Sequence, residues 1–195
     1  MELTQTAPPE SYFKRLSLFD WLFALFLISG AGYALNLYSI HMNIYDKSIL
    51  LAAVGVFSIL GWNWKPIRLL MIGVAVLSLF AISSYHGDLA RGNQAFFLKY
   101  LFASQSAIMW MSALFVMATL SYWISLATRS EFAAKVGSGL TWAAILMGLI
   151  GMMVRWYESY LISPDVGHIP ISNLYEVFIL FSIITSLLYL HYERL

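Results

Sequence analysis

Residues 137–157 read GSGLTWAAILMGLIGMMVRWY, and this stretch shows most directly what kind of fold the chain adopts. It carries no charged side chain before Arg155 and has the length of about 20 residues that a helix needs to cross ~30 Å of hydrocarbon. Backbone polar groups find no water there, so each spanning segment must be helical. Apolar runs predict spans at 18–38, 48–63, 67–85, 102–126, 137–157 and 173–191. The sequence therefore predicts an all-α, polytopic transmembrane helix bundle with about six spans.

The composition of the whole chain supports the same class. Hydrophobic residues make up 61% of the 195 residues and charged residues 11%, whereas soluble domains carry roughly 45–50% and about 25%. A chain of this length cannot bury that much apolar surface in a soluble core, so we expect a lipid bilayer around it. The net charge of +1 gives no reason to expect a nucleic-acid partner. With no cysteine, the chain has no thiolate metal site and no dithiol relay, and we predict no metal site.

Basic residues in the short loops predict the orientation. We expect residues 1–17 to form a polar cytoplasmic tail and residues 18–195 to form one six-helix transmembrane domain. A cytoplasmic N-terminus places seven basic residues inside and four outside. The 158–172 loop then faces the outer side of the membrane.

Small residues in the fifth span predict a helix-packing face. Their spacings of four, three, four and three place them on one side of a helix, where small side chains let helices approach closely. These residues are Gly137, Thr141, Ala144, Gly148 and Gly151. The next step of four reaches Arg155, which could hold an anion such as a carboxylate at the outer mouth of the bundle. Alternatively, Arg155 snorkels to the interface and pairs with Glu158 three residues later.

The segment before the sixth span holds the densest group of polar residues. Asn173 and Glu176 have the i, i+3 spacing of a capping box, and Pro170 just upstream favours a turn followed by a helix start. Gly167 suggests a turn that aims the imidazole of His168. A neutral imidazole can ligate a metal or heme iron, or accept a proton. The alternative is a hydrogen-bonded structural histidine.

Residues 155–176 read RWYESYLISPDVGHIPISNLYE and lead into an apolar helix. This pattern resembles the N-terminal part of the CcsA/ResC family, the multi-spanning heme-handling proteins of cytochrome c-type biogenesis by system II. The upstream stretches FKRLSLFDWLFAL and HGDLARGNQAFFLKYLFASQSAIMWMSALF are also similar to family members, so the resemblance covers essentially the whole chain. It marks Arg155 and His168 as candidate cofactor-binding residues. Residues with a motif or structural role are Gly167, Pro170, Asn173, Tyr175 and Glu176.

The resemblance implies a function in cytochrome complex assembly. It implies delivery of heme to the outer face of a bacterial inner (cytoplasmic) membrane and its attachment to apocytochrome c. The implied partners are a ResB/CcsB-type membrane protein, apocytochrome c and thioredoxin-like thiol reductants. The family's tryptophan-rich heme segment and flanking histidines lie beyond the matching motif, so we expect the chain to be part of a heme lyase complex and inactive alone. The alternative is a non-catalytic multi-span membrane scaffold or transporter subunit. No residue is assigned a catalytic role.

Overall fold

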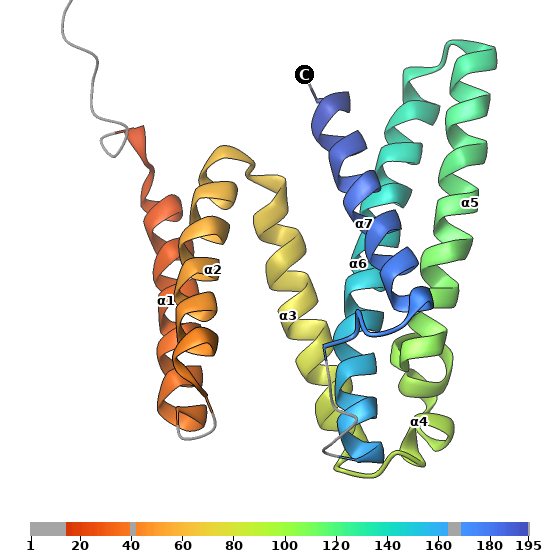
Figure 1. Cartoon of the computed structure of the whole chain (residues 1–195). Helices are drawn as coiled ribbons and strands as arrows, with labels where there is room; N and C mark the ends of the chain where they lie inside the picture. Colours follow the sequence, from red (N-terminus) through yellow and green to blue (C-terminus); the bar gives the residue numbers. More distant parts are fainter. Residues whose placement is uncertain (1–14, 40–41, 164–168, 195) are drawn as a thin grey trace, which may run out of the picture. The chain divides into compact units, whose positions relative to one another are not determined.

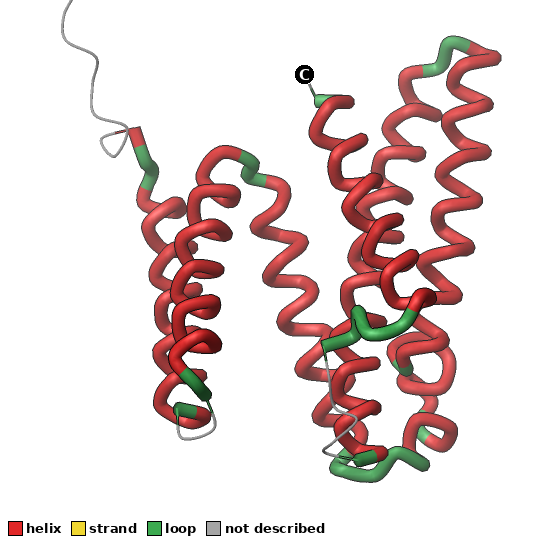
Figure 2. Tube along the Cα trace, in the orientation of Figure 1, coloured by secondary structure: helices red, strands yellow, loops and turns green. Residues whose placement is uncertain are grey.

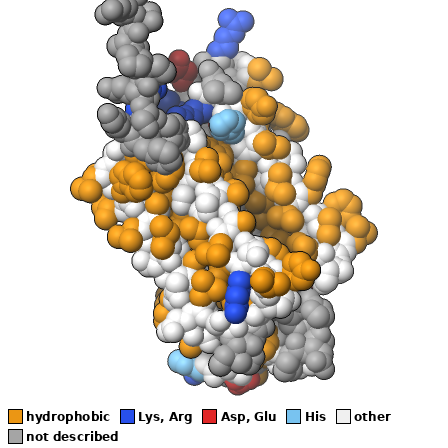
Figure 3. Space-filling model, turned by 60° about the vertical axis from the view of Figure 1, so that its left-hand side comes forward, with side chains coloured by type: hydrophobic (Ala, Val, Ile, Leu, Met, Phe, Trp, Pro, Cys, Tyr) orange, Lys and Arg blue, Asp and Glu red, His pale blue; other side chains and the backbone are white. Residues whose placement is uncertain are grey.

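A computed structural model describes residues 15–39, 42–163 and 169–194, which form helices joined by loops (Figures 1 and 2). Within these residues there is no strand, and six helices are long and apolar enough to cross a membrane. Hydrophobic side chains cover much of the face shown in Figure 3, and few charged side chains interrupt them. Exposed apolar surface of this extent requires an apolar environment. The prediction of an all-α polytopic membrane protein is therefore confirmed.

The six long helices follow the predicted spans in order. They are α1 (Leu18–Tyr38), α2 (Ile44–Asn63), α3 (Pro66–Tyr85), α5 (Ser104–Thr128), α6 (Glu131–Ile162) and α7 (Leu174–Glu193). Between α3 and α5 lie a short helix α4 (Arg91–Gln94) and a π-helical turn η2 (Leu98–Phe102), which the sequence did not predict. A loss of regular hydrophobic period over these residues hides such short elements from sequence reading.

Side-chain caps explain where the predicted starts of two helices were wrong. Helix α2 begins four residues before the predicted position because Asn43 and Asp46 form a capping box, with bonds of 2.9 and 3.0 Å. Helix α6 begins at Glu131 because the Ser130 hydroxyl accepts the amide of Ala133. In both cases the cap satisfies an amide that the helix itself leaves unpaired.

The far end of α6 also differs from the prediction. The loop expected from residue 158 begins only after Ile162, because residues 158–162 continue the helix. No glycine or proline interrupts this segment, and Ser159 donates back to the carbonyl of Arg155 at 2.9 Å. The additional turn carries Glu158 inside a regular helix rather than in a loop.

The helices divide into two compact units, one reaching to Leu69 and one beginning at Leu70. In the first unit α1 packs against α2, and the Phe23 ring occupies the space that a Cβ at Gly61 would need. A polar cluster lies beside this contact, which we call the Asp20–Arg68 cluster. Arg68 pairs with Asp20 and donates from Nε to the Gly61 carbonyl at 2.6 Å. Its guanidinium lies 5.6 Å from the centre of the Phe23 ring.

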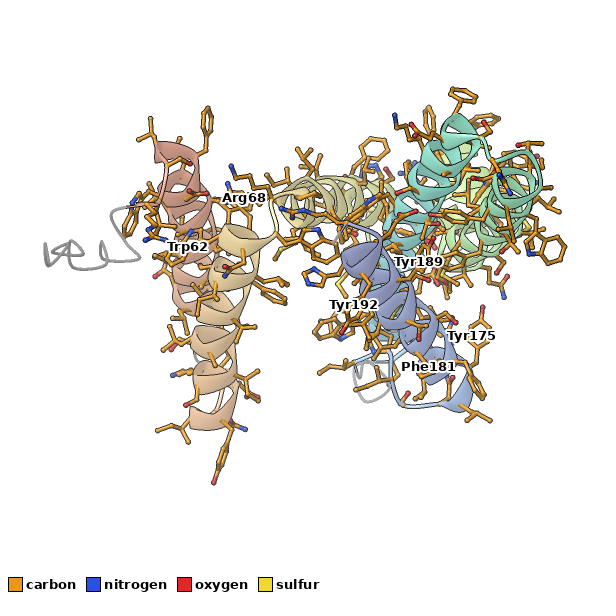
Figure 4. All side chains as sticks on the ribbon, turned by 90° about the horizontal axis from the view of Figure 1, so that it is seen from above. Trp62, Arg68, Tyr175, Phe181, Tyr189 and Tyr192 are labelled. Atoms are coloured by element: carbon orange, nitrogen blue, oxygen red, sulfur yellow. The ribbon has the colours of Figure 1, made fainter. Side chains whose placement is uncertain are left out.

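Trp62 completes the Asp20–Arg68 cluster. Its indole Nε1 donates to the Asp20 carbonyl at 2.9 Å, and Figure 4 shows Trp62 and Arg68 on their helices. Only 12% of the Arg68 side chain and 7% of the Asp20 side chain are exposed. The ion pair of Arg68 and Asp20 is therefore largely buried.

In the second unit α6 packs against both α5 and α7 (Figure 1). Helix α6 has more buried residues along its span than any other helix of the described part. This central position places the C-terminal turns of α6 among the ends of its neighbours, where the candidate site lies.

Candidate functional site

The small residues of α6 are buried against the neighbouring helices. The five small residues predicted to form a packing face are all buried: Gly137, Thr141, Ala144, Gly148 and Gly151. A Cβ at Gly148 would lie 2.5 Å from Met111 Sδ of α5 and 3.0 Å from Ile183 of α7, and one at Gly151 would lie 2.8 Å from Ile108. Real Cβ atoms essentially never approach within 3.0 Å, as the contacts with Met111 and Ile108 would require, so the absence of side chains at these positions lets the helices lie close together.

Glu158 lies further along α6 and is buried with three hydrogen bonds. Its carboxylate accepts the Tyr85 hydroxyl at 2.5 Å, the Ser104 amide at 3.1 Å and the Ser104 hydroxyl at 2.5 Å. Ser104 is the first residue of α5, whose own N-cap residue Ala103 makes no side-chain cap. Glu158 therefore caps α5 from a different helix, where a carboxylate also meets the positive end of the helix dipole. One side chain thus joins the ends of α3, α5 and α6.

Glu176 plays a related part at the start of α7. Asn173 Oδ1 accepts the Glu176 amide at 2.9 Å, so Asn173 is the N-cap residue of α7. In a standard capping box the acidic side chain would accept the N-cap amide. Here Glu176 Oε2 accepts the amide and the hydroxyl of Ser172, one residue earlier, at 3.0 and 3.2 Å. The other oxygen of Glu176 remains for Arg155.

Arg155 connects α6 to α7 through this second oxygen. Its Nε lies 3.6 Å from Glu176 Oε1, and the exposed fractions of the two side chains are 40% and 6%. Pairing with Glu158, the alternative from sequence, is wrong, because Glu158 turns to Tyr85 and Ser104 instead. Within the described residues the Arg155 guanidinium donates no hydrogen bond. Most of its five N–H donors are therefore available to a ligand.

A pocket of about 180 Å³ opens beside Arg155. The residues that line it include Glu158, Asn93 and Gln105. The oxygens of Glu158 already accept hydrogen bonds from Tyr85 and Ser104, so the guanidinium and the amide groups are the donors left to meet the oxygens of a carboxylate. Arginine can bind such a group with two parallel bonds. Ligand sites usually measure about 300–1,000 Å³, so this pocket can seat an acidic group of a larger molecule but not the whole molecule.

Other predicted site residues lie apart from this pocket or outside the described part. His168 and Gly167 lie outside the described residues, so their roles stay predictions. Pro170 is buried just before α7. Tyr175 is 57% exposed and lines a groove between α5 and α7 rather than the pocket at Arg155 (Figure 4).

Among the described residues Arg155 offers a partner to the carboxylates of a heme, and no histidine lines the pocket beside it. The histidines among them are His86 and His191, which are both exposed and do not line the pocket at Arg155. In this part of the chain no three His, Asp or Glu side chains are grouped to hold a metal ion. The guanidinium of Arg155 is the group in this pocket whose chemistry suits a carboxylate such as those of heme.

Sequence reading missed Tyr85 and Ser104 as members of the site. Nothing local marks them, because Tyr85 looks like an interfacial aromatic residue and Ser104 like the start of an apolar run. Both contact Glu158, from which Ser104 lies 54 positions away in the chain and Tyr85 lies 73 positions away. The one available signal is Glu158 itself, an acidic residue at the end of a long apolar helix.

Comparison with known proteins adds no relative: no family model, curated protein or solved structure matches this chain. The candidate site is therefore defined by the contacts and charges of Arg155, Glu158 and Glu176.

Proposed function

We propose that the chain acts in cytochrome c maturation, as the N-terminal part of a CcsA/ResC-like protein. In this role it belongs to a complex that delivers heme to the outer face of the membrane and attaches it to apocytochrome c. The supporting observation is the position of Arg155, which pairs loosely with Glu176 and stays 40% exposed at the mouth of a polar pocket. Both residues belong to the motif on which the resemblance depends.

Arg155 would help to bind the heme and would not take part in its attachment to the apocytochrome. Heme carries two propionate carboxylates, and a guanidinium binds a carboxylate through two parallel hydrogen bonds. Glu176 lies near Nε, so it orients the guanidinium while the terminal N–H groups stay available. The chain would work with a ResB/CcsB-type membrane protein and apocytochrome c. Since it has no cysteine, thiol reduction falls to thioredoxin-like partners.

We place the protein in a bacterial inner membrane with its N-terminus in the cytoplasm. The excess of basic residues on that side supports this orientation. The meeting of the end of α3, the start of α5 and the end of α6 at Glu158 agrees with helices that cross the membrane alternately. In this orientation the pocket at Arg155 opens toward the outer side, where cytochrome c is assembled.

The function can be tested by deleting the gene in its native bacterium and staining membrane proteins for covalent heme. We expect holocytochrome c to be lost and to return when the gene is supplied. Arg155→Ala should restore several-fold less holocytochrome than the wild-type gene, with equal protein in immunoblots of membranes. Arg91→Ala, an exposed arginine of α4, is the matched control and should restore the wild-type level.

Two results would count against these proposals. Normal holocytochrome in the deletion strain would remove the maturation function and favour the membrane scaffold or transporter subunit. Loss of holocytochrome on deletion, combined with full rescue by Arg155→Ala, would keep the function but remove the role of Arg155.

A further inference from the structure

A groove of about 590 Å³ lies between α3 and α6, apart from the pocket at Arg155. Its walls are almost wholly apolar or aromatic and include Val74, Ala75 and Ile82 of α3 and Trp156, Tyr157 and Tyr160 of α6. Both helices are long and apolar enough to span a membrane, so a groove between them lies within the membrane-spanning part of the chain. Its volume falls in the range of about 300–1,000 Å³ that is typical of sites for small molecules.

Ser78 of α3 is also among the residues that line this groove, and its side chain ends in a hydroxyl. Ser78 is 5% exposed, and its Oγ is the buried side-chain oxygen that lacks any hydrogen-bond partner in the described part of the chain. Several other helical serines donate to the carbonyl four residues earlier, as Ser84, Ser112 and Ser182 do at 2.8, 3.1 and 2.8 Å. Leaving a buried hydroxyl without a partner costs free energy, so a ligand that supplies an acceptor is stabilised there.

The depth of Ser78 restricts what can supply that acceptor. It lies seven residues before Tyr85 at the end of α3, which is about 10 Å along a helix. Ester and headgroup oxygens of phospholipids lie in the interfacial layer, outside the ~30 Å hydrocarbon core. An acyl chain at this depth offers no acceptor. The partner of Ser78 must therefore carry its oxygen on a body that itself dissolves in the membrane.

The walls of the groove favour a flat ring as that body. Trp156 and Tyr157 present aromatic side chains, which pack well in offset or edge-to-face contact with another ring. We propose that the groove between α3 and α6 binds a membrane-soluble molecule with a planar, carbonyl-bearing ring and an apolar tail, the chemistry of a prenylquinone. A ring carbonyl accepts the hydrogen bond from Ser78, and the tail follows the aliphatic wall. This site is independent of the function proposed above.

Quenching of tryptophan fluorescence tests the proposal, because Trp156 lines the groove and quinones quench indole emission on contact. The full chain is placed in phosphatidylcholine nanodiscs and titrated with decylubiquinone. We expect saturable quenching that Trp156→Phe removes. Ser78→Ala should raise the dissociation constant about fivefold to tenfold, the effect of one hydrogen bond. Ser84→Ala is the matched control and should bind as the wild type does, since its hydroxyl already has a partner.

Three results would overturn the proposal. One is quenching that rises without saturation, as expected if another helix or lipid already fills the groove. Another is equal affinity of the wild type and Ser78→Ala, when circular dichroism and size-exclusion chromatography show that both are folded. The third is displacement of decylubiquinone by n-decane at matched membrane concentration, which would identify the groove as a site for hydrocarbon chains alone.

Discussion

The two units of the molecule each hold an arginine near a carboxylate, and the two arginines are placed differently. Arg68 makes a close ion pair with Asp20, donates to a backbone carbonyl and is 12% exposed. Arg155 lies 3.6 Å from Glu176, donates no hydrogen bond within the described residues and is 40% exposed. Arg68 thus uses its donors inside the fold, whereas Arg155 keeps most of them available.

This difference separates a structural charge from a candidate binding group. A buried pair is tightly coupled, because removing one partner leaves the other charge uncompensated. An exposed and loosely paired arginine contributes little to stability, because water and salt screen it. Stability measurements on the two sites therefore test the functional assignment without knowledge of the ligand.

The largest effect should come from breaking the Asp20–Arg68 cluster. Arg68→Met leaves Asp20 buried without its cation and should lower the free energy of unfolding by about 3 kcal/mol. Unfolding of the detergent-purified protein by SDS, followed by tryptophan fluorescence, measures the change. Asp20→Asn combined with Arg68→Met should cost less than Arg68→Met alone, since the unpaired charge is then gone. A single variant as stable as the wild type would contradict the buried pairing.

A smaller loss should follow from removing the inner carboxylate of the second unit. Glu158→Ala leaves the donors of Tyr85 and Ser104 without an acceptor and α5 without its cap, at a cost of about 2 kcal/mol. The same SDS titration measures it. Tyr85→Phe removes one of the three bonds and should cost about 1 kcal/mol. If Glu158→Ala unfolded no more easily than Tyr85→Phe, the capping of α5 by Glu158 would be wrong.

The close approach of α6 to its neighbours can be tested with two glycines of that helix. Gly148→Ala should destabilise by about 1 to 2 kcal/mol, because the new methyl group would overlap Met111. Gly139→Ala is the matched control, with no atom within 4 Å of the added Cβ, and should be neutral or stabilising by up to about 1 kcal/mol. Equal stability of the two variants would show that the packing beneath Arg155 is looser than described.

The smallest change in stability should come from Arg155 itself. Arg155→Ala should cost less than about 1 kcal/mol, because the side chain is exposed and its ion pair is long. The contrast with Arg68→Met is the decisive measurement, and both can be made in one series of SDS titrations. A loss for Arg155→Ala as large as that for Arg68→Met would make Arg155 a structural residue and remove it from the candidate site.

The class of the protein and the order of its helices follow from the amino-acid sequence. Hydropathy is a property of each segment alone, so the six apolar helices could be predicted before any contact was known. The small residues of α6 and the cap at Asn173 were visible for the same reason, since helical spacing is local. Boundaries were less accurate where a cap such as Asn43 extended a helix beyond its apolar run.

Which polar groups meet, in contrast, depends on how the helices pack. Asp20 with Arg68, Glu158 with Tyr85 and Ser104, and Arg155 with Glu176 are pairs that helix rotation and packing select. The lone hydroxyl of Ser78 in an apolar groove is likewise a consequence of how α3 lies against α6. Hydropathy is summed along the chain, whereas hydrogen bonds depend on distances of about 3 Å between residues far apart in it. The membrane fold could therefore be predicted from hydropathy along the chain, whereas the polar contacts could be identified only from the packed arrangement of the helices.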